Sequence, residues 1–315
     1  MSRKRLISIA AICRNEVGNI GELYDRLSTV IESLPAYDFE IIIGDNLSTD
    51  GTRDVLRELA KRDKRVKVIL NANNFGAVRS GYNTMLRAQG DAVIAISSDM
   101  SPPPEIIPSL ISAWEGGAHL VCAVRKQGEE HGLMWVLRQI FYSLIARLSE
   151  TEQIRNFTGT GLYSRKMVEA LKRFHDPYPY LRGMVGEIGL SRTEVVFVPE
   201  KRKSGKSKHN LFNLYDLAMT GFVNHTKLPL RLAVFSGFVL AGLSLLVALG
   251  YFIYKLLNWE TFSLGLAPIV IGLFFFSAVQ LIFIGILGEY IGAIYTRVQN
   301  KPLVIEEELL NFDDN

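Results

Sequence analysis

Two long stretches without a charged residue lie near the C-terminal end of the chain, and they constrain its fold more than any other feature. Residues 232–254 contain no Asp, Glu, Lys or Arg, and neither do residues 261–288. A helix needs about 20 mainly apolar residues to cross the roughly 30 Å hydrocarbon layer of a membrane. Each stretch reaches that length, so the sequence predicts two transmembrane helices, at about 230–256 and 262–288, within a membrane segment at 229–298.

Charged residues beside the two stretches predict their orientation. Lys227 and Arg231 precede the first stretch, and Arg297 and Lys301 follow the second. The connector at 255–260 carries one Lys and one Glu, with Trp259 at the depth where aromatic side chains favour the membrane interface. Because Lys and Arg gather on the cytoplasmic side, we expect a multi-pass protein of the cell (inner) membrane with both termini, including a tail at 299–315, in the cytoplasm.

Residues 210–228, just before the first stretch, carry apolar side chains at helical spacing. They follow a basic run, KRKSGKSKH at 201–209. One interpretation is a helix packed on the preceding domain. The other is an amphipathic helix lying on the bilayer surface, and the neighbouring span and basic run favour it, because basic groups are attracted to anionic lipid.

Composition excludes several classes of protein. The formal charge of the 315 residues is +3, and the one dense basic run lies beside the membrane segment, so nucleic acid is not an expected partner. Cys13 and Cys122 each lie in an apolar stretch, which indicates reduced core thiols instead of a disulfide framework or a zinc site. The short apolar run near the N-terminus meets Arg14 and Glu16 instead of a cleavage site, so it predicts a strand, not a signal peptide.

Residues 1–209 alternate between strand-like and helix-like segments. Apolar, β-rich runs occur at 6–12, 39–44, 66–70, 92–96, 120–124 and 195–198, and helical periodicity occurs at 20–34, 53–61 and 106–114. This alternation is typical of an α/β fold, with a mostly parallel, doubly wound sheet covered by helices on both faces. In such folds ligands bind outside the carboxyl ends of the strands.

The predicted strand ends gather polar residues. Asp45 begins DNLSTDGT, in which Asp50, Gly51 and Thr52 are explained by turn and helix-capping roles, but Asp45 itself is not. Turn and capping roles do not explain Asp99 either, in the segment SSDMSPPPE at 97–105. Ser101, just before the prolines of that segment, is a candidate helix N-cap. Neither GxGxxG after the first strand nor GxxxxGK[ST] occurs, so the common phosphate-binding loops are absent from the sequence.

These motifs resemble those of the family 2 glycosyltransferases, which have the GT-A fold. DNLSTDGT is similar to the family's DDGSTDGT, RNE at 14–16 to the end of its YNE, and SSDMSPPPE stands where the family has DADLQDPPE. RGMVGEIG at 182–189 and RKSGKSK at 202–208 are similar to later RGLV and RxxGxSK segments. With the two predicted spans, the chain resembles over its whole length the polyprenyl-phosphate glycosyltransferases of the dolichol-phosphate mannose synthase type.

The resemblance implies a nucleotide-sugar donor, with UDP as the expected nucleotide. Asp45 would accept a hydrogen bond from the base, and Glu16 would approach the nucleoside. The nucleotide-binding residues that the resemblance implies are Ile12, Arg14, Glu16, Asp45, Asn46, Ser98 and Asp99.

The resemblance also implies a Mg²⁺ or Mn²⁺ ion on the donor diphosphate, held by Asp99 and Ser101, since hard cations prefer oxygen ligands. Asp99 and Arg125 are the expected catalytic residues. The polyprenyl phosphate acceptor would be bound by Arg125, Arg138, Arg202 and Ser207. The sequence leaves the oligomeric state open, and a homo-oligomer is compatible with it.

The chain departs from the family pattern at several of these positions. Ser97 and Ser101 replace an Asp and a Gln of the metal motif, and Asn46 replaces the second Asp of the base-binding motif. Ile12 and Arg14 stand where the family often has Pro and Tyr. Gly159, in NFTGTGLYSR at 156–165, occupies a position where relatives carry an Asp proposed as the base.

The absence of the proposed base at position 159 bears on whether the acceptor is a sugar hydroxyl or a phosphate. A sugar hydroxyl would need a positioned base, worth about 10²- to 10⁴-fold in rate. A phosphate monoester has a second pKa of about 6 and is already largely dianionic at neutral pH. It therefore needs positioning by cations and not deprotonation by a base. A lipid phosphate acceptor is therefore favoured. Two alternatives stay open. One is a glycan acceptor with Glu187 as the base. The other is a non-catalytic membrane scaffold, which is favoured by SSD in place of the family's DAD metal motif.

Overall fold

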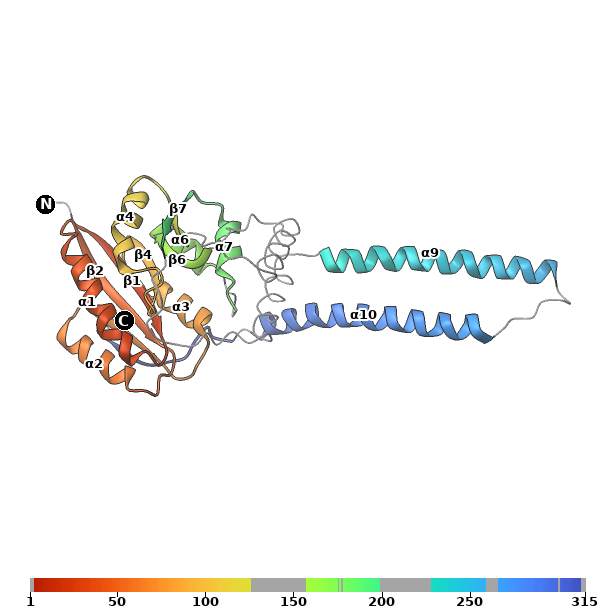
Figure 1. Cartoon of the computed structure of the whole chain (residues 1–315), viewed down its shortest axis with the longest axis horizontal. Helices are drawn as coiled ribbons and strands as arrows, with labels where there is room; N and C mark the ends of the chain where they lie inside the picture. Colours follow the sequence, from red (N-terminus) through yellow and green to blue (C-terminus); the bar gives the residue numbers. More distant parts are fainter. Residues whose placement is uncertain are drawn as a thin grey trace. The chain divides into compact units, whose positions relative to one another are not determined.

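The computed structural model describes residues 3–125, 157–174, 176, 178–198, 228–258, 266–299 and 301–312 (Figure 1). The described residues form two compact units. Of the described residues, the first unit contains those up to 125, those at 157–198 and those at 301–312, and the second contains those at 228–258 and 266–299. The predicted boundary near residue 209, the basic run and the interfacial helix up to residue 227 lie outside the described residues, whereas the predicted boundary near residue 229 falls at the start of a described helix that begins at Leu228.

Within the described residues, the first unit contains one sheet of eight strands in the order β7-β5-β6-β4-β1-β2-β3-β8. The neighbours β1–β2, β1–β4, β2–β3 and β5–β7 are parallel, whereas β6 is antiparallel to β4 and β5, and β8 to β3. The predicted mostly parallel sheet is confirmed. The strands are β1 Arg5–Cys13, β2 Tyr37–Asp45, β3 Val66–Asn71, β4 Ala92–Ser97, β5 Leu120–Arg125, β6 Phe157–Ser164, β7 Arg192–Phe197 and β8 Glu306–Leu310.

Helices cover both faces of this sheet. One core cluster joins alternate strand residues to α1, α2, η1 and α4, and a second joins the other strand faces to α3, α6 and α7. Burial on both faces explains why the central strands read as nearly continuous apolar runs. The helices are α1 Val17–Glu32, α2 Thr52–Arg62, α3 Ala77–Leu86, η1 Pro104–Ile106, α4 Ile107–Glu115, α6 Arg165–Lys172 and α7 Leu181–Ile188.

Strand β6 was not predicted, because its sequence FTGTGLYS is rich in glycine and carries little apolar alternation. Gly161 has a φ of +146°, and a Cβ at this position would overlap the carbonyl oxygen of Val121 on β5. The missing side chain lets β6 approach β5 closely enough for pairing. Glycine within a strand commonly marks such a close backbone approach.

Strand β8 was also not predicted, since residues 299–315 were interpreted as a cytoplasmic tail. It pairs with β3 at the edge of the sheet, and the register shifts between Leu70 and Asn71. Asn311, which follows β8, donates from its side-chain amide to the carbonyl groups of Ala60 and Val66. These contacts make the C-terminal residues part of the first unit.

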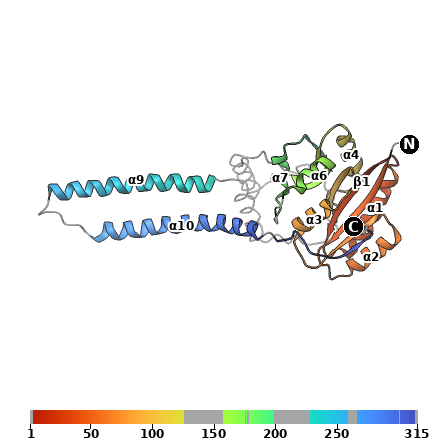
Figure 2. The same ribbon diagram turned by 180° about the vertical axis from the view of Figure 1, so that it is seen from behind.

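The second unit is a pair of long helices, α9 Leu228–Leu257 and α10 Leu266–Val298, which lie side by side in Figures 1 and 2. Two segments, Leu232–Leu257 and Ile271–Thr296, are long and apolar enough to cross a membrane by length and composition. The two apolar helices expected from the sequence are confirmed. The second candidate span lies further toward the C-terminus than the predicted 262–288 and includes Glu289.

Gly161 provides a test of the close approach between β6 and β5. We expect Gly161→Ala to destabilise the protein by about 2–3 kcal/mol, because the new methyl group meets backbone that cannot move aside. Gly21→Ala is the matched control: it lies on α1 with open space around the added Cβ and should be neutral or stabilising by about 0.5–1 kcal/mol. Thermal unfolding of the detergent-solubilised protein measures both, and equal melting temperatures would contradict this account.

Candidate active site

The parallel strands bring the sequence-predicted polar residues to one edge of the sheet. In the ladder, Cys13 at the end of β1 lies opposite Asp45 at the end of β2, and Ile12 lies opposite Ser97 at the end of β4. Arg125 ends β5, and the antiparallel strand β6 begins at the same edge. The loops that follow β1, β2 and β4 are therefore neighbours, as expected from the alternating strand pattern.

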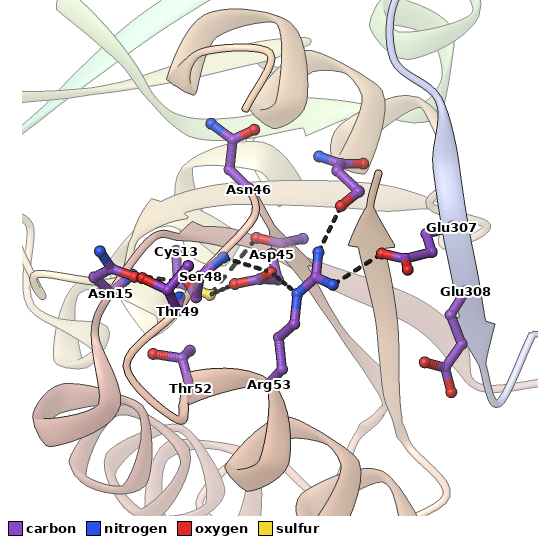
Figure 3. A network of polar contacts seen from close by, with 12 residues as sticks. Cys13, Asn15, Asp45, Asn46, Ser48, Thr49, Thr52, Arg53, Glu307 and Glu308 are labelled. Atoms are coloured by element: carbon purple, nitrogen blue, oxygen red, sulfur yellow. Dashed lines mark hydrogen bonds and ion pairs between the residues drawn. The ribbon is translucent and has the colours of Figure 1, made fainter. Parts of the chain in front are cut away.

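The loops after β1 and β2 are tied together by reciprocal hydrogen bonds (Figure 3). The backbone N–H of Asn15 donates to Ser48 Oγ at 2.8 Å, and the backbone N–H of Thr49 donates to Asn15 Oδ1 at 2.8 Å. Each loop thus supplies both a backbone donor and a side-chain acceptor. The polar residues of the DNLSTDGT segment hold the RNE segment in place, which is a wider role than the turn and capping roles expected for them.

A second set of bonds ties the start of α1 to the start of α2. The backbone N–H of Glu16 donates to Thr52 Oγ1 at 3.0 Å, and that of Val17 donates to Asp50 Oδ2 at 3.1 Å. Desolvation alone would raise the pKa of Asp50, but hydrogen bonds from Thr52 and Val17 outweigh it and hold the pKa below its usual value. Asp50 therefore stays ionised at neutral pH and continues to accept hydrogen bonds from Val17 and Thr52.

Asp45 is completely buried, with 0% of its surface exposed. Its Oδ2 accepts from Arg53 Nε at 2.7 Å and from the backbone N–H of Ser48 at 3.0 Å, and Cys13 Sγ lies 3.9 Å from Oδ1. Burial raises the pKa of the Cys13 thiol, and the charge of Asp45 raises it further, so the thiol is neutral and a weak donor. The stronger donors both bind Oδ2, which leaves acceptor capacity on Oδ1.

Asn46 is directed toward the loop after β3 instead of the loop after β1. Its Oδ1 accepts from the backbone N–H of Phe75 at 2.9 Å and from Ser80 Oγ at 2.9 Å, and its Nδ2 donates to Asn74 Oδ1 at 2.7 Å. An aspartate here could not donate to Asn74. The asparagine therefore has a structural role in fixing that loop, and its nucleotide-binding role stays a prediction.

Backbone strain gathers at the same edge. Outside glycine, the described residues with positive φ are Asn15 at 56°, Leu47 at 60°, Met100 at 56° and Asn311 at 58°. The first three lie two or three residues beyond the ends of β1, β2 and β4. A left-handed conformation is unfavourable for Leu and Met by about 1–2 kcal/mol, and such strain commonly marks functional sites.

Asp99 lies two residues beyond β4 and is half-buried, and its Oδ1 accepts from the backbone N–H of Ser101 at 3.2 Å. The interpretation of Ser101 as a helix N-cap is wrong, because η1 begins at Pro104 with Pro103 at the N-cap position. The prolines stiffen the chain before the helix instead. Ser98, next to Asp99, is buried.

The donor set suits a cation that arrives with its substrate. Among the residues that the structure describes, no group of three or more His, Cys, Asp and Glu side chains could hold a metal ion. Mg²⁺, however, usually keeps several waters and binds through one or two carboxylates plus substrate phosphates. A single carboxylate at Asp99, with the hydroxyl of Ser101 nearby in the chain, fits such a cation.

The remaining predicted site residues are placed as follows. Glu16 and Ile12 are half-buried, and Arg14 and Arg125 are exposed at the same edge. Gly159 is the third residue of β6 and has a φ of +92°, which an L-residue rarely adopts, so a base at this position would strain the backbone. Glu187 is exposed on α7. The predicted acceptor residues Arg138, Arg202 and Ser207 lie outside the described residues.

Arg53 is the site residue that the sequence analysis missed. It lies in the first turn of α2, where a cation opposes the helix dipole. That unfavourable placement was a readable signal that anionic partners lie close by. Desolvation alone would lower the pKa of Arg53, but Asp45 and Glu307 outweigh it and raise the pKa.

Comparison with known proteins agrees with this architecture. The profile of the family described as "Glycosyl transferase family 2" matches residues 8–172. The SfII prophage-derived bactoprenol glucosyl transferase of Shigella flexneri is 32% identical over 300 residues, covering 95% of this chain and 96% of that protein. The uncharacterized glycosyltransferase YkcC of Bacillus subtilis is 31% identical over 312 residues, covering 98% of this chain and 95% of that protein.

The chain belongs to glycosyl transferase family 2 and is a glycosyltransferase of the GT-A fold. Among solved structures, the mannosyltransferase PcManGT from Pyrobaculum calidifontis in complex with GDP-Man and Mn²⁺ is 15% identical. That likeness covers 96% of this chain and 89% of the other, with a TM-score of 0.47.

Thr52 tests whether the loop ties organise the site. Thr52→Val keeps the side-chain shape but removes the acceptor for Glu16 and the donor for Asp50. We expect a loss of about 1–2 kcal/mol in the free energy of unfolding, with weaker binding of UDP. Thr52→Ser, which keeps the hydroxyl, should retain both properties. Thermal unfolding and calorimetric titration with UDP give the answer, and a Val variant indistinguishable from the Ser variant would refute the role of these ties.

Proposed function

We propose that this glycosyltransferase is membrane-anchored and transfers a sugar from a nucleotide-sugar, expected to be a UDP-sugar, to polyprenyl phosphate, with inversion at the anomeric carbon. The observation that carries the proposal is the match to a bactoprenol glucosyl transferase along nearly the whole length of both chains. That match covers 95% of this chain, so it includes the region of the two apolar helices as well as the first unit.

The proposed donor site is the edge formed by the loops after β1, β2 and β4. Asp45 would accept from the base through Oδ1 once the groups that cover it move aside, because its carboxylate is fully buried in this structure. Glu16 would lie near the nucleoside, and Ile12, Arg14, Asn46 and Ser98 complete the set. Asp99, with Ser101, holds a Mg²⁺ or Mn²⁺ ion. The ion, when bound, neutralises the charge of the leaving diphosphate.

The proposed reaction is an in-line displacement. A phosphate oxygen of the lipid attacks the anomeric carbon, and the bond from that carbon to the β-phosphate oxygen of the nucleotide breaks. No proton has to be removed, because a phosphate monoester with a pKa near about 6 is largely dianionic at neutral pH. Arg125, with Arg138, Arg202 and Ser207, positions the acceptor phosphate.

Two observations support a membrane anchor with the catalytic unit on the cytoplasmic side. The apolar side chains of α9 and α10 are largely exposed, which water would disfavour. Chain segments before α9 and after α10 both belong to the first unit, so an even number of crossings returns the chain to the same side. The Lys and Arg residues beside the helices favour the cytoplasm for that side.

An assay with purified protein tests the proposal. The full-length protein is incubated with labelled UDP-sugars, Mg²⁺ and undecaprenyl phosphate, and label extracted with the lipid is counted. Transfer to lipid supports the proposal. Transfer to a glycan acceptor, lost in Glu187→Gln, would instead support the glycan alternative, and no turnover with any donor would support a scaffold.

Asp99→Ala should lower kcat/KM by about 10²- to 10³-fold, the size typical for loss of one electrostatic stabiliser of a transition state. Asp38→Ala is the control, because this exposed carboxylate lies near the amino end of β2, at the opposite edge of the sheet. Circular dichroism checks that both variants are folded. Turnover of Asp99→Ala equal to that of the control would remove Asp99 from the catalytic site.

A further inference from the structure

The C-terminal strand β8 presents three consecutive carboxylates, and each is bound by an arginine of the catalytic unit. The pairs are Glu306 with Arg87 (bonded by both Nε and Nη2), Glu307 with Arg53 (2.8 Å), and Glu308 with Arg57 (2.8 Å). Such a run is usually a solvated tail. Here it is a docked edge strand that reaches arginines on two helical segments.

A β-bulge determines where these carboxylates point. In the ladder with β3, Leu70 lies opposite Glu308 and Asn71 opposite Glu306, so Glu307 is the extra residue without a ladder partner. A bulge redirects the side chain of the extra residue. Without it, Glu307 and Glu308 would point to opposite faces of the sheet, whereas here both reach α2.

Glu307 and Glu308 nevertheless have different partners. Figure 3 shows the Glu307 carboxylate directed at Arg53 and the Glu308 carboxylate directed away from it. Arg57, the partner of Glu308, also contacts Asp54 at 3.4 Å. Glu308 therefore stabilises the strand through Arg57, while Glu307 alone of the two contacts the arginine that binds Asp45.

Arg53 joins the ends of three strands through its guanidinium group. Its Nε donates to Asp45 Oδ2 at 2.7 Å, its Nη1 to Glu307 Oε2 at 2.8 Å, and its Nη2 to the carbonyl oxygen of Asn71 at 2.5 Å. The Arg53 side chain is 17% exposed, and that of Asp45 is 0% exposed. Since a buried carboxylate is stable only when paired with good geometry, the orientation of Arg53 determines the orientation of Asp45.

The chain of contacts continues into the donor site. Asp45 Oδ2 also accepts from the backbone N–H of Ser48, whose hydroxyl accepts from the backbone N–H of Asn15. Without Glu307, the guanidinium keeps only its bonds to Asp45 and to the Asn71 carbonyl and is held less firmly in the geometry that Asp45 needs. The loops after β1 and β2 then lose a fixed anchor.

We propose that Glu307 is a positioning residue for nucleotide-sugar binding: through Arg53 it fixes Asp45 and the loop at 45–52. This inference rests on the proposed function for the identity of the ligand. Because β8 follows α10 in the chain, the donor site is complete only when the last strand has docked. The C-terminal residues are thus needed to position the residues of the donor site.

The first test uses hydrogen exchange on the full-length protein without ligand. In Glu307→Ala we expect faster exchange in peptides covering residues 45–52, whereas Glu308→Ala should change exchange only in β8 and α2. Glu308→Ala is a close control, since it removes an equivalent ion pair from the adjacent residue. Equal exchange at 45–52 in the two variants would overturn the inference.

The second test is titration with UDP in the presence of magnesium chloride. Because Glu307 is 55% exposed and its ion pair is partly screened, Glu307→Ala should weaken UDP binding by about two- to fivefold. Glu308→Ala should bind as the wild type does. Glu307→Gln, which keeps an acceptor oxygen for Arg53, should lie between the wild type and Glu307→Ala. Equal UDP affinities in the two alanine variants would contradict the inference.

The third test asks whether Glu307 acts through Arg53. Arg53→Lys keeps the positive charge beside Asp45 but cannot make all three contacts at once. If the effect passes through Arg53, adding Glu307→Ala to Arg53→Lys produces no further loss of UDP affinity. Full additivity of the two losses would overturn the proposed route.

The two hypotheses can fail separately. If the wild type does not bind UDP but exchange at 45–52 rises only in Glu307→Ala, the positioning role stands and the proposed function falls. If the wild type binds UDP and the exchange patterns of Glu307→Ala and Glu308→Ala agree at 45–52, the proposed function stands and the positioning role falls.

Discussion

The register of the parallel ladder around β1 is the constraint on which the site depends. β1 is paired with β2 on one side and β4 on the other, which sets Cys13 opposite Asp45 and Ile12 opposite Ser97. A slip of two residues in either pairing would move a carboxylate by about 7 Å, and a slip of one would turn it to the other face. The register is held by apolar side chains buried on both faces. The hydrophobic core therefore determines the geometry of a polar site.

Rigidity at this edge has two sources that act together. Reciprocal hydrogen bonds between the loops after β1 and β2 leave few backbone donors of these loops to be satisfied by water, so the loops are ordered before a ligand arrives. Leu47 and Met100 adopt left-handed conformations that would not persist in isolated loops. The packed strands and the hydrogen bonds between the loops maintain these unfavourable backbone conformations. Preorganisation of this kind reduces the ordering that ligand binding would otherwise require.

The C-terminal strand β8 follows the second unit in sequence but belongs to the first unit. After α10 the chain returns to the first unit, where Arg79 donates to the carbonyl groups of Pro302 and Leu303 before β8 begins. β8 is then the edge strand of the sheet, and its short length, three carboxylates and β-bulge disfavour pairing with another chain. The same strand supplies Glu307 to the arginine that binds Asp45. One short segment thus forms the edge of the sheet and reaches into the network behind the site.

The sequence by itself determined the alternation of strands and helices, the edge at which Asp45 and Asp99 gather, and the two apolar helices, because hydrophobic periodicity and run length are local properties. It could not reveal β6, whose pairing depends on a close approach of Gly161 to Val121, or β8, whose strand character comes from partners far away in the chain. Ser101 looked like a helix cap, yet the prolines delay the helix to Pro104. The role of Arg53 was decided only by the tertiary structure, because its three partners lie on β2, β3 and β8, and β8 comes from the far end of the chain.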